Sequence, residues 1–430
     1  MTNYLVRRFL WFRERGFVQI TQKTLVSLFP FFLFSGIIRV ISLSVFSELG
    51  YINQLFSVSD WLPAFKITGQ VLINLSNFLG GLVGPLSTYF AGKYTAGHYG
   101  RSTGTAGVTS LLVSLIIGSQ ELLLSPLNDG VLTRINLPAS INIMLAIFVG
   151  YLVGQIFRFS RASDDQIVDK DYIYQPKTVR PIFLSLILAI GLNILFVIGE
   201  QDNVFLMIRQ VTSTFTVTDN HLFSTFMMGL LNTFSAWIGN SQAFALNSIA
   251  EDSFALENLT YAVSHHTTTG LPHLYTLTNL YHSYGLVAGI GSGLALLVAL
   301  LLKSTSFKDK KVSLLSVFPS LFNNGAPLMV GIPVLLNLVY LIPFLLAPMV
   351  NMGIAAVALA IRLMPAAVYP VPDGTPSLLY AFIGTGGSLR ALAVSLLCFA
   401  VDVAIFIPFV HLSNKVQHGL KEEGESNEVQ

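Results

Sequence analysis

The stretch AGIGSGLALLVALLLKSTSFKDKK, residues 288–311, decides the fold class of this chain. Its first fifteen positions hold no charged side chain, and four lysines follow within 303–311. An apolar run long enough to cross about 30 Å of hydrocarbon as a helix, followed by a basic cluster, is typical of a membrane span that ends at the cytoplasm. We therefore expect a span over 283–302 and a cytoplasmic loop after it.

Apolar runs of this kind recur through most of the 430 residues, of which 53% are hydrophobic and 11% charged. A soluble domain carries roughly a quarter charged residues, so this chain has too few charges to cover a water-soluble surface. The strand alternation of an outer-membrane barrel is absent. We predict an all-α polytopic membrane protein. The expected spans are 24–47, 68–92, 105–124, 137–157, 182–199, 221–240, 283–302, 334–352 and 391–412.

Charges between these runs indicate the orientation. Basic residues gather at 7–15, 93–101, 158–180 and 303–311, and the intervening loops are acidic. Placing the basic loops in the cytoplasm makes the first six spans alternate, and it requires one further crossing within 241–282. We expect about ten transmembrane helices plus re-entrant hairpins, with both termini cytoplasmic. The net charge of +2 is too small to suggest a nucleic-acid partner.

Polar segments divide the chain, with SRASDDQIVDKDYIYQPKTVR as the most polar linker. At the N-terminus, arginines interleaved with Phe9, Trp11 and Phe12 suit either a helix lying in the membrane interface among lipid headgroups or a plain positive flank. The expected organisation is an N-terminal segment over 1–20, a first transmembrane half over 21–159, a cytoplasmic linker over 160–180, a second transmembrane half with the binding hairpins over 181–413, and a polar cytoplasmic tail over 414–430.

Two segments are polar and rich in helix-breaking residues, unlike a helix that faces lipid. They are AWIGNSQAFALNS (236–248) and SLFNNGAPLMVGIP (320–333). Amides and an aromatic ring suit a neutral polyhydroxylated ligand, because each hydroxyl needs both a donor and an acceptor and the apolar sugar face stacks on a ring. Alternatively, the asparagines satisfy backbone groups freed at helix breaks. The candidate substrate-binding residues are Trp237, Asn240, Gln242, Asn323 and Asn324.

The second half of the chain resembles a known family. NNGAPLMVGIPVLLNLVYLIPFLLAPMVN (323–351), GTGGSLRALAVSLLCFAVDVAIFIPFV (384–410) and the Gly-Ser-Gly span at 288–311 are similar to the membrane IIC component of the bacterial sugar phosphotransferase system, lactose/cellobiose class. The resemblance implies a dimeric permease in the bacterial cell membrane. Such a permease binds a sugar at mid-membrane, and a cytoplasmic IIB protein carrying a phosphocysteine phosphorylates that sugar.

Two departures affect the chemistry that the resemblance implies. Where the family carries Asn-Glu-Pro in its hairpin, this chain reads Gly325, Ala326 and Pro327. Where the family carries a histidine beside the reacting hydroxyl, the best match places Ile238. These substitutions put phosphoryl transfer in doubt and leave the fold and sugar binding in place.

Three functions therefore compete. The first is a sugar-transport component that works with a phosphorylating partner. The second is a degenerate relative that senses a sugar or organises partners, and the third is an ion-coupled transporter, supported by Asp402 inside an apolar run. No catalytic set, cofactor or metal site is expected, because the histidines at 265, 266, 273 and 282 match no metal-site spacing.

Overall fold

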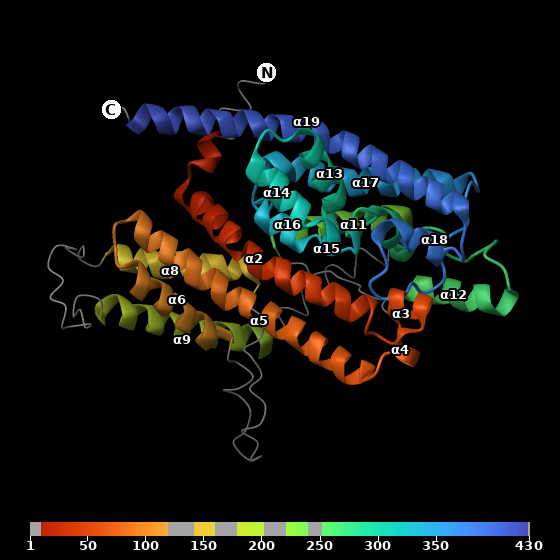
Figure 1. Ribbon diagram of the computed structural model, residues 1–430, viewed down its shortest axis with the longest axis horizontal. Helices are drawn as coiled ribbons and strands as arrows, with labels where there is room; N and C mark the ends of the chain where they lie inside the picture. The colour runs from red at the N-terminus through yellow and green to blue at the C-terminus, as the bar shows by residue number, and fades with distance from the viewer. Residues whose placement is uncertain (1–9, 119–141, 160–178, 202–220, 240–251, 429–430) are drawn as a thin grey trace, which may run out of the picture. The chain divides into compact units, whose positions relative to one another are not determined.

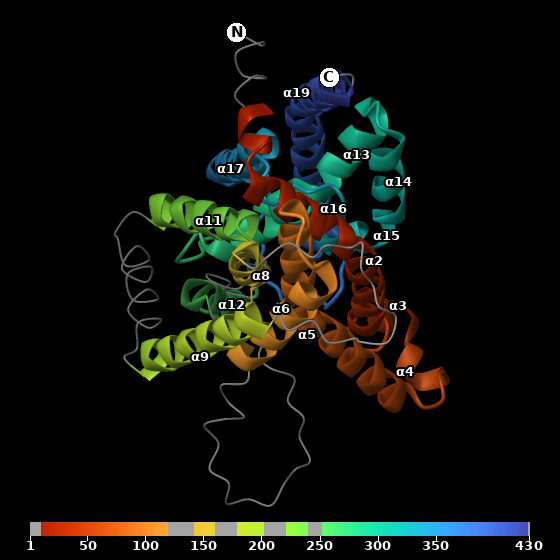
Figure 2. The same cartoon turned by 90° about the vertical axis from the view of Figure 1, so that its left-hand side faces the viewer.

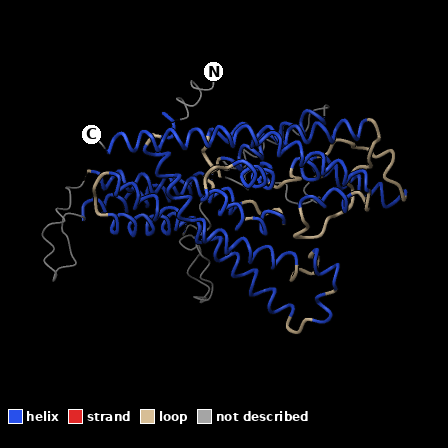
Figure 3. Tube along the Cα trace, turned by 45° about the horizontal axis from the view of Figure 1, so that its top comes forward, coloured by secondary structure: helices blue, strands red, loops and turns tan. Residues whose placement is uncertain are grey.

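In the computed structural model, residues 10–118, 142–159, 179–201, 221–239 and 252–428 are described. Their regular elements are all helices, and the described ranges contain only an isolated bridge between Gly50 and Asp373 in place of a strand (Figure 3). Each expected apolar run overlaps a helix. The all-α fold class is therefore confirmed.

Among the described residues, six helical segments are long and apolar enough to cross a membrane. Two shorter apolar helices, α6 (Thr103–Gly118) and α8 (Ile143–Arg158), accompany them. The described residues do not fix the number of crossings, so about ten stays a prediction. The six are α2 (Gly16–Ser44), α5 (Phe65–His98), α9 (Val179–Gln201), the segment Thr278–Lys303, α17 (Leu338–Ala360) and α19 (Leu389–Glu428).

The chain forms two compact units. The first contains residues 1–12, 33–74 and 209–430, and the second contains 13–32 and 75–208. These units are defined by contacts, and the division into two transmembrane halves joined by a cytoplasmic linker stays a prediction. The linker residues 160–178 lie outside the described part of the chain.

In the second unit, α6, α8 and α9 lie side by side (Figures 1 and 2). Their shared core contains Val113, Val149, Phe157 and Ala189, all buried. Gly150 and Gly154 let α8 approach α5 closely, because a Cβ at either position would overlap α5 atoms. Close approach through small residues is the usual way in which membrane helices pack.

In the first unit, α19 packs against α13 (Gly293–Lys303) and α17, and α17 contacts α11 (His221–Trp237). Figure 1 shows α13 and α17 beside the long blue α19. The same unit holds the remaining short helices. They are α3 (Tyr51–Phe56), α4 (Val58–Trp61), α12 (Ser253–His265), α14 (Phe307–Leu315), α15 (Val317–Leu321), α16 (Ala326–Gly331), η4 (Ser377–Leu379) and α18 (Tyr380–Gly384).

The span Thr278–Lys303 is broken rather than continuous. It begins as the π-helix η2 (Thr278–Gly285) and passes through the single 3₁₀ turn η3 (Ile290–Ser292) before α13 starts. Gly289, Gly291 and Ser292 have φ values of 81°, 61° and 56°, in the left-handed region. Irregular backbone within an apolar segment is tolerated where it is buried in protein or lines a cavity. This break therefore marks the interior of the first unit.

Candidate functional site

A second helix break carries the two candidate asparagines. α15 ends at Leu321 and α16 begins at Ala326, so residues 322–325 form the turn that the Gly-Ala-Pro sequence predicts. Asn323 has φ 63° and an exposed side chain. Asparagine adopts this conformation more readily than other residues with a Cβ. The backbone thus accounts for an asparagine at 323 and leaves its amide available.

The Asn324 amide has a partner in α2. Its Nδ2 donates to the Gly36 carbonyl oxygen at 3.4 Å, and its backbone N–H donates to the Pro319 carbonyl at 2.9 Å. A Cβ built at Gly36 would lie 3.0 Å from Pro327 Cγ and 3.3 Å from Asn324 Nδ2. The turn therefore packs tightly on α2. The Asn324 amide already donates a hydrogen bond to the backbone, in addition to any bond that it makes to a ligand.

Trp237 lies at the C-terminal end of α11 and is buried, with its ring stacked on Phe234 at a centroid distance of 6.1 Å. Its indole Nε1 is buried and has no hydrogen-bond acceptor among the described residues. Buried Trp N–H groups usually find a partner. An unsatisfied donor here is consistent with a ligand-facing ring.

The helix that carries Trp237 and the turn that carries Asn323 both lie close to the break in the span Thr278–Lys303. α11 contacts η3, and a Cβ built at Gly289 would lie 3.4 Å from Asn323 Oδ1. The helix that ends at Trp237 and the side chain of Asn323 thus both lie close to the stretch 289–292, and no hydrogen bond joins Trp237 to Asn323 in the described part of the chain. Asn240 and Gln242 lie outside the described residues. The site made of these five side chains stays a prediction.

A buried polar cluster lies close to this break and was not predicted. Asn351 of α17 donates through Nδ2 to Asp402 Oδ2 of α19 at 2.8 Å, and both residues are fully buried. Arg390, the basic residue near the start of α19, is exposed and takes no part in this pair. Asn351 could have been recognised in the sequence as a candidate partner of Asp402, because a polar residue inside an apolar run is costly unless it is paired.

Two acidic residues of the segment 252–257, Asp252 and Glu257, have structural roles. Asp252 is buried: Oδ1 accepts from the Ala255 N–H and caps α12, and Oδ2 accepts from the Thr278 N–H and hydroxyl. Glu257 pairs with His273 Nε2 at 2.7 Å. Neither carboxylate is therefore a free replacement for the acid missing at Ala326.

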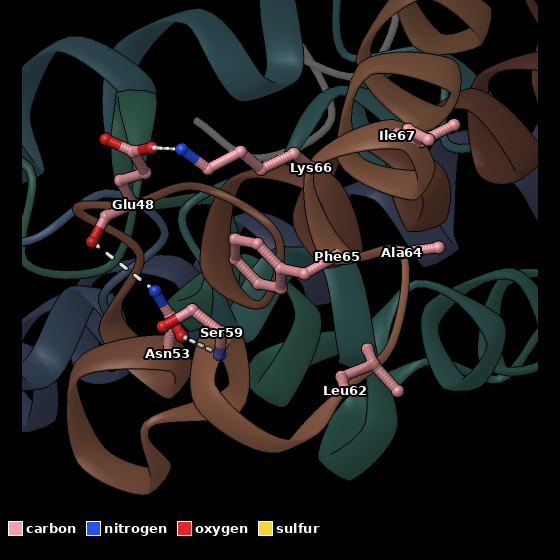
Figure 4. A pocket seen from close by; sticks show the side chains of 8 residues that line it. All are labelled: Glu48, Asn53, Ser59, Leu62, Ala64, Phe65, Lys66 and Ile67. Carbon is pink, nitrogen blue, oxygen red and sulfur yellow. Dashed lines mark hydrogen bonds and ion pairs between the residues drawn. The ribbon is translucent and has the colours of Figure 1, made fainter.

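Figure 4 shows a separate surface pocket of about 530 Å³ in the first unit, around α3, α4 and the start of α5. Its charged groups, Glu48 and Lys66, form an exposed ion pair at 3.2 Å. Asn53 donates to the carbonyls of Ser47 and Glu48 and accepts from the Ser59 N–H. Because its polar groups already satisfy one another, this pocket is a weaker candidate than the broken segment.

Comparisons with known proteins agree with the resemblance seen in the sequence. The family model described as phosphotransferase system, EIIC matches residues 22–348. The cellobiose-specific EIIC component of Lactococcus lactis subsp. lactis (strain IL1403) is 33% identical over 137 residues, which are 32% of this chain and 28% of that protein. The lactose-specific EIICB component of Staphylococcus aureus is 31% identical over 122 residues, 28% of this chain and 21% of that protein. The matches with these relatives thus span about a third or less of their length.

Among solved structures, a transporter that is the IIC component of an N,N'-diacetylchitobiose-specific phosphotransferase system is similar at 19% identity. The TM-score is 0.42, and the match covers 96% of both chains. The family match begins in α2, so it extends the resemblance into the first half of the chain, and it ends before the stretch 384–410. Because it covers well over half of the 430 residues, this multi-pass membrane protein belongs to the phosphotransferase system EIIC family.

Proposed function

We propose that this chain is the sugar-binding membrane component of a phosphotransferase system, with both termini in the cytoplasm. Its substrate is a neutral sugar or glycoside, and cellobiose and lactose, named in its relatives, are the first candidates. Its cytoplasmic partner is a IIB-like protein, as the fused EIICB relative suggests. A homodimer follows from the resemblance alone.

The observation that carries the proposal is the pair of broken segments inside the matched region. The Asn323 amide oxygen lies close to Gly289, and α11, whose last residue Trp237 has an indole N–H without an acceptor among the described residues, contacts η3 in the same broken span. Amide and indole groups can bind sugar hydroxyls without a fixed charge. A neutral ligand suits a site whose nearby carboxylates are already paired.

Ala326 and Ile238 favour a second candidate function, a IIC-like sensor or partner-binding protein without phosphoryl transfer. Ala326 is the first residue of α16 and offers no carboxylate to a sugar hydroxyl. Ile238 follows α11 and offers no imidazole. Loss of a group that assists proton transfer slows a reaction by about 10²–10⁴. Slow or absent phosphorylation is therefore expected even when sugar binds.

Membranes that contain this protein, a phosphorylated IIB protein of the cellobiose type and radiolabelled cellobiose test both functions. The expected result is saturable sugar binding with little or no sugar phosphate. Robust phosphorylation would contradict the degenerate alternative and would require another group to act in place of the missing acid. Absence of binding to cellobiose, lactose and related glycosides would instead contradict the sugar-binding proposal.

A further inference from the structure

The second unit contains a cavity of about 340 Å³ between α2, α5 and the start of α6. We call it the basic pocket, and its polar lining consists of Gln19, Lys23, Lys93, Tyr94, His98 and Thr103. Cavities that bind small ligands begin at about 300 Å³. The basic pocket is thus large enough for a small polar group, and none of its lining residues is among those assigned to sugar.

The charged side chains that line the basic pocket are all positive. Lys23 and Lys93 line it with no acidic side chain, and neither lysine forms an ion pair with a carboxylate in the described ranges. Just beyond α5, the Nε of Arg101 is buried without an acceptor among the same residues. The Tyr94 hydroxyl is held by Ser27 at 2.6 Å. Because the Tyr94 proton is shared with Ser27, whose own proton goes to the Lys23 carbonyl, the two lysine ammonium groups are the main donors for an anion.

Helix length and polar side chains indicate the depth at which the basic pocket lies in the membrane. α2 has 29 residues and α5 has 34, which correspond to about 43 Å and 51 Å of helix, longer than about 30 Å of hydrocarbon. The pocket is formed by the first turns of α2 and the last turns of α5. Because these turns carry Gln19, Lys23 and Lys93, we expect them to extend beyond the apolar layer, at the depth where lipid headgroups lie.

We propose that the basic pocket binds the phosphate headgroup of an anionic lipid. Lys23 and Lys93 supply the charge that the phosphodiester requires, and Thr103 and Gln19 supply neutral donors. A basic pocket on a membrane protein at the headgroup level is a recognised place for an anionic lipid. The proposal is independent of the sugar site.

Native mass spectrometry of the purified full chain tests this proposal, with phosphatidylglycerol and phosphatidylcholine of the same acyl chains as probes. The unmodified protein should retain phosphatidylglycerol preferentially. Lys23→Gln/Lys93→Gln should weaken that retention roughly ten- to thirtyfold and leave phosphatidylcholine unchanged. Lys23→Arg/Lys93→Arg should keep the preference, because the charge is kept.

The matched control is Lys308→Gln/Lys310→Gln, which removes the same charge from exposed positions of α14 and should retain the preference. If the double variant fails to fold, Lys23→Gln alone, at an exposed position, serves the same comparison. Equal phosphatidylglycerol retention by unmodified protein and variant would overturn the proposal. So would displacement of the lipid by glycerol 3-phosphate at equal concentration, since the source would then be a soluble phosphate.

Discussion

Asp402 and Asn351 show how a single pair of residues supports the first unit. Both are fully buried on neighbouring apolar helices, and one amide donates to one carboxyl oxygen at 2.8 Å. The buried Ser292 hydroxyl of the broken span interacts with the same Asp402 carboxyl group. The pair therefore ties α17 to α19 beside the broken span, which is a structural role.

Asn351→Leu should destabilise the protein, because it leaves a buried acceptor without its donor at a cost of about 1–3 kcal/mol. Thermal unfolding in detergent measures the effect. Met352→Leu, at an equally buried position, is the control and should change little. The double variant Asn351→Leu/Asp402→Leu should be less destabilised than the sum of the single variants. Strict additivity would show that the two side chains do not act as a pair.

Asn323 combines a backbone role with a proposed ligand role, and two substitutions separate them. Asn323→Gly removes the amide but accepts φ 63°, so folding should be preserved and sugar binding should weaken roughly tenfold. Asn323→Ala should weaken binding equally and also lose about 1 kcal/mol of stability. Binding titration and thermal unfolding measure the two effects. Unchanged binding by Asn323→Gly would leave Asn323 with the backbone role only.

At the scale of elements, the break in the span Thr278–Lys303 is fixed by close packing. A Cβ at Gly291 would overlap the ring of Phe344 in α17, and its φ of 61° already disfavours any other residue. Gly293, two positions later, has an ordinary helical φ of −56°. A Cβ built at Gly293 would have Gly325 Cα, at 3.9 Å, as its nearest neighbour. The two glycines therefore differ sharply in what they tolerate.

Gly291→Ala should lower the folded yield or the unfolding temperature strongly, because overlap in a packed core and left-handed strain each cost about 1–3 kcal/mol. Gly293→Ala should be close to neutral. Size-exclusion profiles after heating compare the two variants. If both behaved alike, the broken segment would not be held against Phe344.

Local patterns in the sequence predicted most of the helices and the turn before Ala326, because length, hydropathy and helix breakers act within short windows. The contacts that give these elements their roles are long-range. Asn324 and Gly36 are separated by 288 positions, and Asn351 and Asp402 by 51. Periodicity carries no information about such pairs. Trp237 is predicted as a binding residue from its residue type, and that stays a prediction, whereas the pairing of Asp252 with Thr278 is seen only in the folded chain.

For the whole molecule, the basic loops predict which side of the membrane each loop faces. Cysteine labelling can test this orientation, because the chain has a single natural cysteine that can be removed. Cys398 is buried, so Cys398→Ala gives a background for labelling. A cysteine replacing Lys308 should react only from the cytoplasmic side, and one replacing the exposed Gln54 only from outside. Labelling of position 308 from outside would reverse the orientation.

We propose that this EIIC family member binds a neutral sugar next to Ala326, where the resemblance implies an acid. Isothermal titration of the purified protein with cellobiose and lactose tests it most directly, using Ala326→Glu and the uncharged control Ala326→Gln. We expect weak binding by the unmodified protein, tightened by roughly one to two powers of ten in Ala326→Glu, since a charge-assisted hydrogen bond contributes about 1.5–3 kcal/mol. Ala326→Gln should gain less. Absence of binding in all three proteins would show that the chain binds neither sugar, and equal gains by glutamate and glutamine would show that a charge at position 326 does not strengthen binding.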